Sequence, residues 1–219
     1  MSETTTDSAD VVALQRRIDE DFLGPVDSKW LGGYPDDIEA ALIDTIYSVQ
    51  AKYGTPTTGV RGVVGRWRSV RAGSKDDLDA LANPSGVSLA DVAQNDAVLS
   101  GRRKYEVVQD AAGQLVAAGI KSSADLADPA SREKAKTTWM RVHGLAGVTW
   151  AYFSMLTGYP DVKADVHIRR YVADALGVSD VSPERARQLL HAVTSPFADV
   201  THLDHAVWRL QSERAEGQE

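Results

Sequence analysis

The residues best suited to chemistry lie between Val142 and Arg170. Near the start of this stretch, the sequence HGLAG contains Gly144 and Gly147, which allow the backbone to approach another molecule closely and to adopt a positive φ. An apolar helix is predicted to follow, and the unpaired N–H groups at the start of a helix suit a phosphate. One helix and one loop further on, Asp165 opens a second predicted helix. A phosphate-binding turn followed by a carboxylate points to a nucleic-acid substrate.

The composition favours a globular protein and excludes several kinds of site. The chain has 219 residues, of which 43% are hydrophobic and 25% are charged, as is typical of globular domains. It contains no cysteine, which rules out disulfides, thiolate zinc sites and cysteine-bound iron–sulfur clusters. No run approaches the roughly 18 apolar residues of a membrane span, and the start MSETTTDSAD lacks the features of a secretory signal. We therefore expect a cytoplasmic, nucleoid-associated protein with no membrane partner.

The net charge of −7 opposes binding to nucleic acid, because phosphates are neutralised by Lys and Arg. The basic residues are, however, grouped in three segments. Residues 54–75 carry five of them and no acid, and residues 102–104 and 132–141 form two further clusters. Each cluster alone is more readily explained as a solvated face. Three clusters in one acidic protein weaken that explanation.

Apolar periodicity predicts helices along most of the chain. The expected helices cover about residues 11–23, 36–53, 60–70, 78–81, 89–98, 105–116, 123–126, 134–142, the segment after the glycine turn, 166–176, 183–193 and 203–210. No segment shows sustained alternation of period two, and no internal repeat is evident. Residues 1–9 are expected to form a disordered tail and residues 212–219 a polar tail. The predicted fold class is all-α.

Taken in order, these patterns resemble the helix-hairpin-helix DNA glycosylase superfamily, and most closely its endonuclease III-like and adenine-glycosylase branches. The family hairpin, roughly L-P-G-V-G-x-K-T-A, is similar to VHGLAGVTW at residues 142–150. The family stretch G-x-P-x-x-x-x-D-x-H-x-x-R is matched without a gap by Gly158, Pro160, Asp165, His167 and Arg170. Residues 43–54 are similar to the family helix that ends in S-x-Q-A, and residues 104–108 to the helix that begins K-A-x-x-I. The resemblance covers about residues 10–210.

The resemblance implies two helical lobes. One lobe would comprise residues 32–158 and carry the hairpin, and the other would combine residues 10–31 with residues 159–211. Double-stranded DNA would lie across the hairpin, and the groove between the lobes would receive a flipped-out base. The expected partner is therefore double-stranded DNA, and the expected state is a monomer.

The resemblance assigns catalysis to Asp165. Cleavage of an N-glycosidic bond builds positive charge on the sugar, which a nearby carboxylate stabilises while it orients water. The alternative is that Asp165 only N-caps the following helix, although both roles can hold together in this family. His167 and Arg170 are expected to support the local structure, with Arg170 paired to an acid in the core.

Departures from the family pattern define the expected reaction. Relatives that also cut the strand carry a lysine in the hairpin helix, which forms a Schiff base with the sugar, and the matching residue here is Val148. Ala146 replaces the second hairpin glycine, and no cysteines are present to hold a cluster. The expected protein is a monofunctional DNA glycosylase of base excision repair, which hydrolyses the N-glycosidic bond and has no lyase activity at the abasic site.

The resemblance also implies a set of DNA contacts. They are Gln50, Ser100, Arg102, Arg103, His143, Gly144, Leu145, Ala146, Gly147 and Thr149. Gln50 would fill the space left by the flipped base, unless it is a plain surface glutamine, and residues 99–103 lie where relatives place a wedge. Trp150 and Tyr152 are candidates for stacking in a base pocket, although core packing is the favoured interpretation of Trp150.

No cofactor is expected, apart from a monovalent cation that hairpins of this type can hold through backbone carbonyls. His202 and His205 flank Asp204, but no third ligand is evident, so a metal site is disfavoured. Three other functions stay open. The first is a catalytically silent or redirected DNA-binding protein, the second is a scaffold turned to modified bases in phage or defence systems, and the third is a helical interaction protein without a DNA role. Nothing in the sequence identifies the base.

Overall fold

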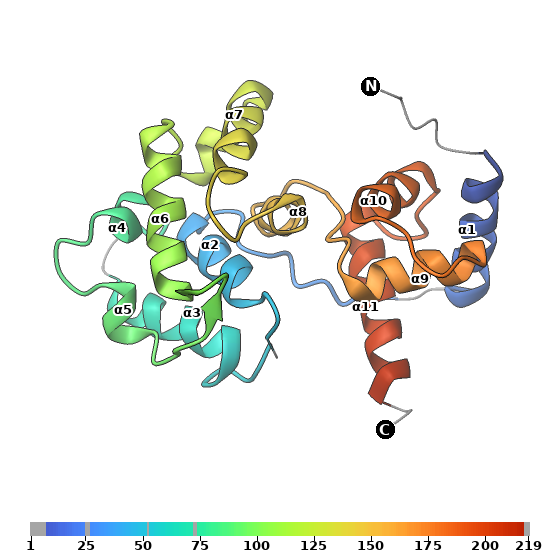
Figure 1. Ribbon diagram of the computed structural model, residues 1–219, viewed down its shortest axis with the longest axis horizontal. Coiled ribbons are helices and arrows are strands. Elements are labelled where there is room, and N and C mark those ends of the chain that lie inside the picture. Colours follow the sequence, from blue (N-terminus) through green and yellow to red (C-terminus); the bar gives the residue numbers. More distant parts are fainter. Residues whose placement is uncertain (1–7, 25–26, 52, 72–73, 217–219) are drawn as a thin grey trace. The chain divides into compact units, whose positions relative to one another are not determined.

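The computed structural model describes residues 8–24, 27–51, 53–71 and 74–216, and it divides into two compact helical units (Figure 1). Unit 1 combines the chain up to Leu31 with the chain from Pro160 onward, and unit 2 comprises Gly32–Tyr159. The lobes expected from the sequence meet between residues 31 and 32 and between residues 158 and 159, and the units divide after residues 31 and 159. The all-α prediction is confirmed for the described residues, apart from two strands of two residues each.

Unit 2 is built around one apolar helix. Its elements are α2 (Ile38–Tyr47), α3 (Gly59–Val70), α4 (Asp79–Ala82), α5 (Leu89–Val92), β1 (Val98–Leu99), β2 (Arg102–Arg103), α6 (Lys104–Ala117), the 3-10 helix η1 (Ser123–Leu126), α7 (Pro129–Trp139) and α8 (Gly147–Leu156). Helices α3, α6 and α8 all pack against α2, every residue of which is buried. Asp37 begins α2 by accepting a hydrogen bond from the N–H of Ala40 at 2.9 Å, as an N-cap aspartate commonly does.

A buried ion pair joins α2 to α3. The carboxylate of Glu39 accepts hydrogen bonds from Trp67 Nε1 at 2.7 Å and from Arg71 Nε and Nη2 at 2.8 and 2.9 Å. Glu39 is completely buried, so its charge needs these donors. Arg71, from the arginine-rich segment 54–75, is therefore engaged inside the unit.

Lys104 also has a structural role. Its ammonium group donates to the backbone oxygens of Tyr47 at 2.9 Å and Val49 at 2.6 Å, at the end of α2. The residue is 2% exposed, and burial lowers its pKa. The grouping of Lys104 with the basic cluster at residues 102–104 is thus wrong as a description of the surface.

Unit 1 holds a second hydrophobic core. Its helices are α1 (Ser8–Asp21), α9 (Val166–Leu176), α10 (Pro183–Ala192) and α11 (Val200–Glu216). Side chains of all four helices contribute to the core, with Ile18, Tyr171, Leu189 and Leu203 each completely buried. Ser182 begins α10 by accepting from the N–H of Arg185 at 3.1 Å, with a proline next in the chain. These local signals explain why the helix starts were predictable.

Several predicted boundaries are wrong. The helix expected over residues 36–53 ends at Tyr47, and the one expected over residues 89–98 ends at Val92, because the chain turns to form β1 and β2. The polar tail expected from residue 212 continues α11 to Glu216, and α1 begins at Ser8, inside the tail expected over residues 1–9. The rest of both tails lies outside the described residues.

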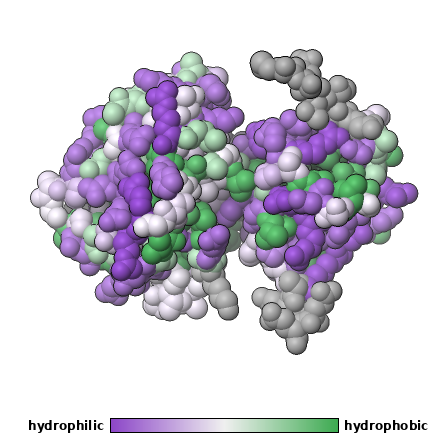
Figure 2. Space-filling model, in the orientation of Figure 1, coloured by the Kyte–Doolittle hydropathy of each residue, from purple (hydrophilic) through white to green (hydrophobic). Residues whose placement is uncertain are grey.

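The described surface is of mixed polarity. On the visible face of each unit, hydrophilic side chains are interspersed with small hydrophobic areas (Figure 2). Among the described residues, no helix combines the length and apolar character needed to cross a membrane.

Candidate functional site

The turn between α7 and α8 is a compact hairpin connection in unit 2. It is closed by hydrogen bonds from Val142 N to Trp139 O and from Leu145 N to Val142 O, each 3.1 Å long. Val142 and Leu145 are buried and anchor the turn, whereas His143 between them is exposed. Gly144 has a φ of +93°, a conformation that side chains strongly disfavour. The glycine is therefore required by the shape of the turn.

The start of α8 is open to an anion. Ala146 is the N-cap residue, and its side chain offers no acceptor to the first N–H groups of the helix. Ala146 and Gly147 are both exposed, so the first N–H groups of α8 lie at the surface of the unit. Ala146 has a φ of −153°, which any residue can adopt. The change from the family's glycine to alanine thus costs no backbone strain.

Thr149 stabilises the turn from inside. Its hydroxyl accepts hydrogen bonds from Trp139 Nε1 and from Ala146 N, both at 3.0 Å, and donates to Ala146 O at 2.7 Å. All of these partners belong to the hairpin and its flanking helices. The hydroxyl expected to contact DNA is therefore engaged in closing the turn.

A second tight turn packs against the hairpin. β1 and β2 pair antiparallel, with Leu99 opposite Arg102, and are joined by Ser100 at φ +50° and Gly101 at φ +81°. Two positive φ values in a two-residue connection are the mark of a type I′ turn. A Cβ added to Gly144 would lie 3.1 Å from Ser100 Oγ and 3.3 Å from Leu99 Cγ. The two loops expected to contact DNA thus lie side by side in unit 2.

The two arginines beside this turn are held by nearby acceptors. Arg102 donates to Asp110 at 2.8 Å and to the backbone oxygen of Glu106 at 3.2 Å. Arg103 lies 3.2 Å from the carboxylate of Asp96 and donates to the backbone oxygen of the same residue at 2.5 Å. Contact of either guanidinium with phosphate therefore requires these bonds to be exchanged or shared.

Gln50 occupies a strained and exposed position. It lies in the turn after α2, has a φ of +50° and is exposed to solvent. A left-handed conformation of a residue other than glycine costs on the order of 1 kcal/mol and persists where the surroundings impose it. Here the ammonium group of Lys104 binds the carbonyl oxygen of Tyr47, the last residue of α2, and that of Val49, the residue before Gln50. The structure thus presents Gln50 on a fixed support.

The two candidate base-pocket residues belong to the interior of unit 2. Trp150 is 7% exposed and packs with its ring centroid 5.9 Å from that of Trp139 and 5.8 Å from that of Phe153. Tyr152 is equally buried and donates its hydroxyl to Asp44 Oδ1 at 3.1 Å. Both residues therefore belong to the core. The sequence had favoured core packing for Trp150 but not for Tyr152.

Asp44 collects three phenol groups in a cluster that the sequence analysis missed. Besides Tyr152, both Tyr34 (at 3.0 Å) and Tyr53 donate to its Oδ2 atom. Burial, followed by the negative charge of Asp44, raises the pKa of each of the three tyrosines. The one signal in the sequence was an acid within the apolar stripe of α2. The cluster links α2 and α8 to the segments on either side of α2.

Asp165 lies in unit 1 and opens α9. Its Oδ1 atom accepts from the N–H groups of His167 at 2.9 Å and Ile168 at 3.4 Å. Both bonds use one carboxylate oxygen, and the residue is partly exposed. The N-cap interpretation is therefore confirmed, and it leaves Oδ2 outside the cap.

The segment that leads to Asp165 is clamped at its start. The N–H of Asp161 donates to Thr201 Oγ1 at 3.1 Å, and the Thr201 hydroxyl donates back to Asp161 O at 3.2 Å. The carboxylate of Asp161 lies 2.6 Å from Arg187 Nε and 3.2 Å from His191 Nε2. Although burial opposes ionisation, these two partners lower the pKa of Asp161.

Asp204 of α11 lies beneath the same segment. Its carboxyl group accepts a hydrogen bond from the backbone N–H of Lys163, and the residue is 5% exposed. Burial, and next the charge of Asp165, raises the pKa of Asp204 well above its ordinary value. Its Oδ1 atom has no hydrogen-bond partner among the described residues. Position in the sequence gave no sign of this burial.

Aromatic rings surround His205. It stacks on Trp208 at 5.8 Å with an interplanar angle of 15°, and Trp30 and His167 contact this pair edge-on, at 5.4 Å from His205 and 6.1 Å from Trp208. His202 pairs instead with Asp199 at 2.8 Å. Within the described parts of the chain, no group of three His, Cys, Asp or Glu residues is placed to hold a metal ion.

The expectation for Arg170 is wrong. The residue is exposed on α9, and in the described structure it makes no ion pair. Its neighbour Arg169 takes the structural role, since it donates to both oxygens of Asp180 at 2.6 and 2.5 Å and to Val181 O at 2.7 Å. The i+1 neighbour on a helix points about 100° away, which explains the exchange.

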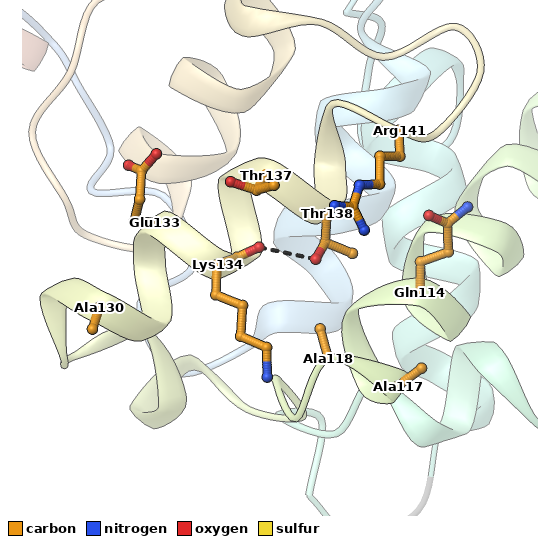
Figure 3. A pocket seen from close by; sticks show the side chains of 9 residues that line it. All are labelled: Gln114, Ala117, Ala118, Ala130, Glu133, Lys134, Thr137, Thr138 and Arg141. Atoms are coloured by element: carbon orange, nitrogen blue, oxygen red, sulfur yellow. Dashed lines mark hydrogen bonds between the residues drawn. The ribbon is translucent and has the colours of Figure 1, made fainter.

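A groove of about 800 Å³ lies between α6 and α7 of unit 2 (Figure 3). It is lined by Gln114, Ala117, Ala118, Ala130, Glu133, Lys134, Thr137, Thr138 and Arg141. The hydroxyl of Thr138 donates to the backbone oxygen of Lys134 at 2.9 Å. Lys134 and Arg141, which directly precedes the hairpin turn, make this the accessible part of the third basic cluster.

A comparison with protein families matches residues 13–212 to a family described as a domain of unknown function (DUF8548). No curated protein and no solved structure matches the chain.

Proposed function

The chain belongs to the DUF8548 family, and we propose from its own residues that it is a monofunctional DNA glycosylase of base excision repair. The observation that carries the proposal is the contact between two tight turns in unit 2. Gly144 of the hairpin and Ser100 of the β1–β2 turn approach so closely that a Cβ on the glycine would lie 3.1 Å from the serine hydroxyl. Two rigid turns brought together beside an open helix start suit the backbone of a duplex.

The hairpin supplies the phosphate contact in this proposal. The N–H groups at the start of α8 carry the positive end of the helix dipole, and the side chain of Ala146 offers them no acceptor. The exposed residues His143, Ala146 and Gly147 allow a phosphate to approach. Lys134 and Arg141 add positive charge on the preceding helix and turn. This local arrangement answers the objection raised by the net charge of −7.

The β1–β2 turn and Gln50 act on the base pairs in this proposal. Both positions hold residues other than glycine at positive φ, namely Ser100 and Gln50 at +50° each. Each is exposed and lies next to a buried anchor, Leu99 and Lys104 respectively. A base leaves the stack at a cost of a few kcal/mol, and rigid protruding side chains offset that cost by filling the space.

Asp165 performs the chemistry in this proposal. The N–H groups of His167 and Ile168 bond to Oδ1, so the helix cap leaves Oδ2 for the reaction. As the bond between the base and the sugar breaks, positive charge develops on the sugar, and the carboxylate stabilises it and orients the attacking water. Val148 at the hairpin-helix position offers no amine for a Schiff base. The product is a free base and an abasic site, and no cofactor takes part.

A catalytically silent DNA-binding protein is the second candidate. N-capping alone accounts for the presence of Asp165, because an aspartate there satisfies two N–H groups whether or not chemistry follows. Both candidates bind double-stranded DNA as monomers and use the same hairpin. Turnover is the property that separates them.

The test is cleavage of duplexes that each carry one altered base, followed by hot alkali. The panel includes uracil, hypoxanthine, alkylated purines, 8-oxoguanine opposite adenine, and 5-hydroxymethyluracil. The proposal predicts a strand break on at least one duplex, only after alkali. A break without alkali would mean that the protein is a lyase and that the interpretation of Val148 is wrong. Binding without any break would favour the silent protein.

A further inference from the structure

Alternate residues of the segment 161–165 are each fixed through a carboxyl group. The carboxylate of Asp161 contacts α10, the N–H of Lys163 donates to the carboxyl of Asp204, and the carboxylate of Asp165 caps α9. The residues between them, Val162 and Ala164, are buried in the core of unit 1 at 1% and 2% exposure. The backbone that carries Asp165 is therefore anchored at every position.

Asp204 is the anchor that local structure does not explain. Asp161 has an ion pair and Asp165 has a helix to cap. Asp204, in contrast, lies within α11 at 5% exposure, with one oxygen that has no hydrogen-bond partner among the described residues. A buried carboxyl with an unsatisfied oxygen opposes folding. Such a group is kept where it serves a purpose other than stability.

We propose that Asp204 is a positioning residue, which holds the segment 161–165, and through it the carboxylate of Asp165, in the geometry of the reaction. This inference rests on the proposed function. The bond from Lys163 N–H to Asp204 fixes the position of the segment relative to α11. Asp165 is tied to the same residue, because its N–H donates to Lys163 O at 2.6 Å. A shift at Lys163 therefore moves Asp165 directly.

The charge of the pair supports this role. Burial disfavours the ionised form of a carboxyl group, and a negative charge nearby disfavours it further. Asp204 is the more buried of the two, and the charge of Asp165 adds to the burial that raises the pKa of Asp204. Lys163 opposes this shift and Asp161 adds to it, and the groups of α10 near Asp161 are Arg187 and His191. The burial of Asp204, together with the charge of Asp165, thus favours the neutral form of Asp204.

Two variants and one control test the role. Asp204→Asn keeps an acceptor for Lys163 N–H and no charge, whereas Asp204→Leu has a similar volume and no acceptor. Asp199→Asn is the matched control, because it changes a carboxyl to an amide next to the start of α11, at a residue that contacts His202. The assay is the single-turnover rate constant on a cleaved duplex, together with the Kd for that duplex.

Positioning predicts an unequal effect of the two variants. Asp204→Asn and the control keep the rate within about threefold of the wild type, whereas Asp204→Leu lowers it by about 100-fold, since a misplacement of about 1 Å can cost that much. The Kd stays within about threefold in all cases, because the proposed DNA contacts lie in unit 2. If Asp204→Leu is folded and fully active, or if Asp204→Asn is as slow as Asp204→Leu, the inference is overturned.

The pH profile separates positioning from a charge effect. A neutral Asp204 leaves the acid limb of the rate profile at the same pH in the wild type and in Asp204→Asn. If Asp204 were ionised, its removal would move that limb to lower pH. A shift of the limb would therefore contradict the inference.

Hydrogen exchange tests the inference without activity. The amide of Lys163 is protected by Asp204 in the wild type, so Asp204→Leu is expected to exchange it at least about tenfold faster, and Asp204→Asn at nearly the wild-type rate. If no duplex is cleaved but this pattern appears, the proposed function fails while the anchor stands as a structural one. Unchanged exchange in folded Asp204→Leu would overturn the anchor itself.

Discussion

The two regions proposed for function differ in what gives them their shape. In unit 2 the interface depends on backbone conformation, with Gly144 at φ +93°, Gly101 at φ +81° and Ser100 at φ +50° in two adjoining turns. In unit 1 the site depends on carboxyl groups, since Asp165 caps α9 and Asp204 holds the preceding segment. Backbone shape suits the recognition of a phosphate chain, and a fixed carboxylate suits chemistry. The comparison predicts that binding and turnover can be broken separately.

The largest effect is expected from Asp165→Asn. The amide still caps α9, because asparagine is as good an N-cap residue as aspartate, but it carries no charge to stabilise the transition state. The rate of base release should fall by about 10³-fold or more, with the Kd for DNA and the thermal midpoint nearly unchanged. Cleavage assays and a binding titration on the same preparation measure both. A variant that retained the wild-type rate would remove Asp165 from the mechanism.

Gly144→Ala should weaken DNA binding by unit 2 without changing the chemistry in unit 1. Its Cβ would meet Ser100 and Leu99 at 3.1 to 3.3 Å and force a residue with a side chain to a φ of +93°. We expect a loss of about 1–3 kcal/mol in stability and a Kd for duplex DNA raised about tenfold. The rate at saturating DNA should stay close to that of the wild type.

Gly147→Ala is the matched control for this change. Nothing lies within 4 Å of the position where its Cβ would be placed, and the residue is at the first position of α8. Its stability should equal or slightly exceed that of the wild type. If both alanine variants lower the free energy of unfolding equally, then the contact between the two turns is not what the glycine at 144 serves.

The next effect concerns pH and the carboxyl pair of unit 1. Folding raises the pKa of Asp204 above its ordinary value of 3.8, through burial and then through the charge of Asp165. Above about pH 4 the folded state therefore holds a proton that the unfolded state has lost, and the free energy of unfolding falls as pH rises, by up to about 1.4 kcal/mol per pH unit. The fall stops once the pH has passed the raised pKa. Below about pH 4 Asp204 is protonated in both the folded and the unfolded state, so it contributes no slope there.

Asp204→Asn should lack this slope. The free energy of unfolding is measured by urea denaturation between pH 4 and pH 8. The value for Asp204→Asn minus the value for the wild type should increase as pH rises. Asp199→Asn again serves as the control and should run parallel to the wild type in this respect. Parallel curves for Asp204→Asn and the wild type would show that Asp204 titrates normally.

The smallest effect is expected from Arg102→Ala. The arginine is already paired with Asp110 at 2.8 Å, so any gain from a phosphate is offset by the loss of that pair. The Kd for DNA should rise by less than about threefold, and the slope of log Kd against log salt should change by less than about one phosphate contact. A larger change would show that the guanidinium leaves Asp110 when DNA binds.

Signals within a few residues were sufficient for most of the helix starts. Asp165 as the N-cap of α9, and Ser182 with Pro183 at the start of α10, could be identified from residue types alone. The two-residue strands at residues 98–103 could not, since two residues show no period. Their position instead follows from the positive φ values of Ser100 and Gly101.

The contacts that define the candidate sites join residues far apart in the chain. Gly144 meets Ser100 across 44 residues, and Tyr152 reaches Asp44 across 108. Pairings of this kind depend on how helices pack, which a single sequence does not encode at any fixed spacing. The same holds for Asp204. In the sequence, the histidines on either side of it suggested a metal site, but in the structure Asp204 is buried and accepts from the backbone of Lys163. Arg170 and Arg169 show the same difficulty over a shorter distance. They are adjacent in the chain but lie on different faces of α9, and only Arg169 pairs with an acid.

The most direct test of the separation between binding and chemistry is one paired measurement. On a duplex that the wild type cleaves, the Kd and the single-turnover rate constant at saturating protein are determined for Gly144→Ala and for Asp165→Asn. The prediction is that Gly144→Ala raises the Kd and keeps the rate constant, whereas Asp165→Asn keeps the Kd and loses the rate constant. If Asp165→Asn cleaves as fast as the wild type, or if Gly144→Ala binds as tightly, the assignment of chemistry to unit 1 and of DNA binding to unit 2 is contradicted.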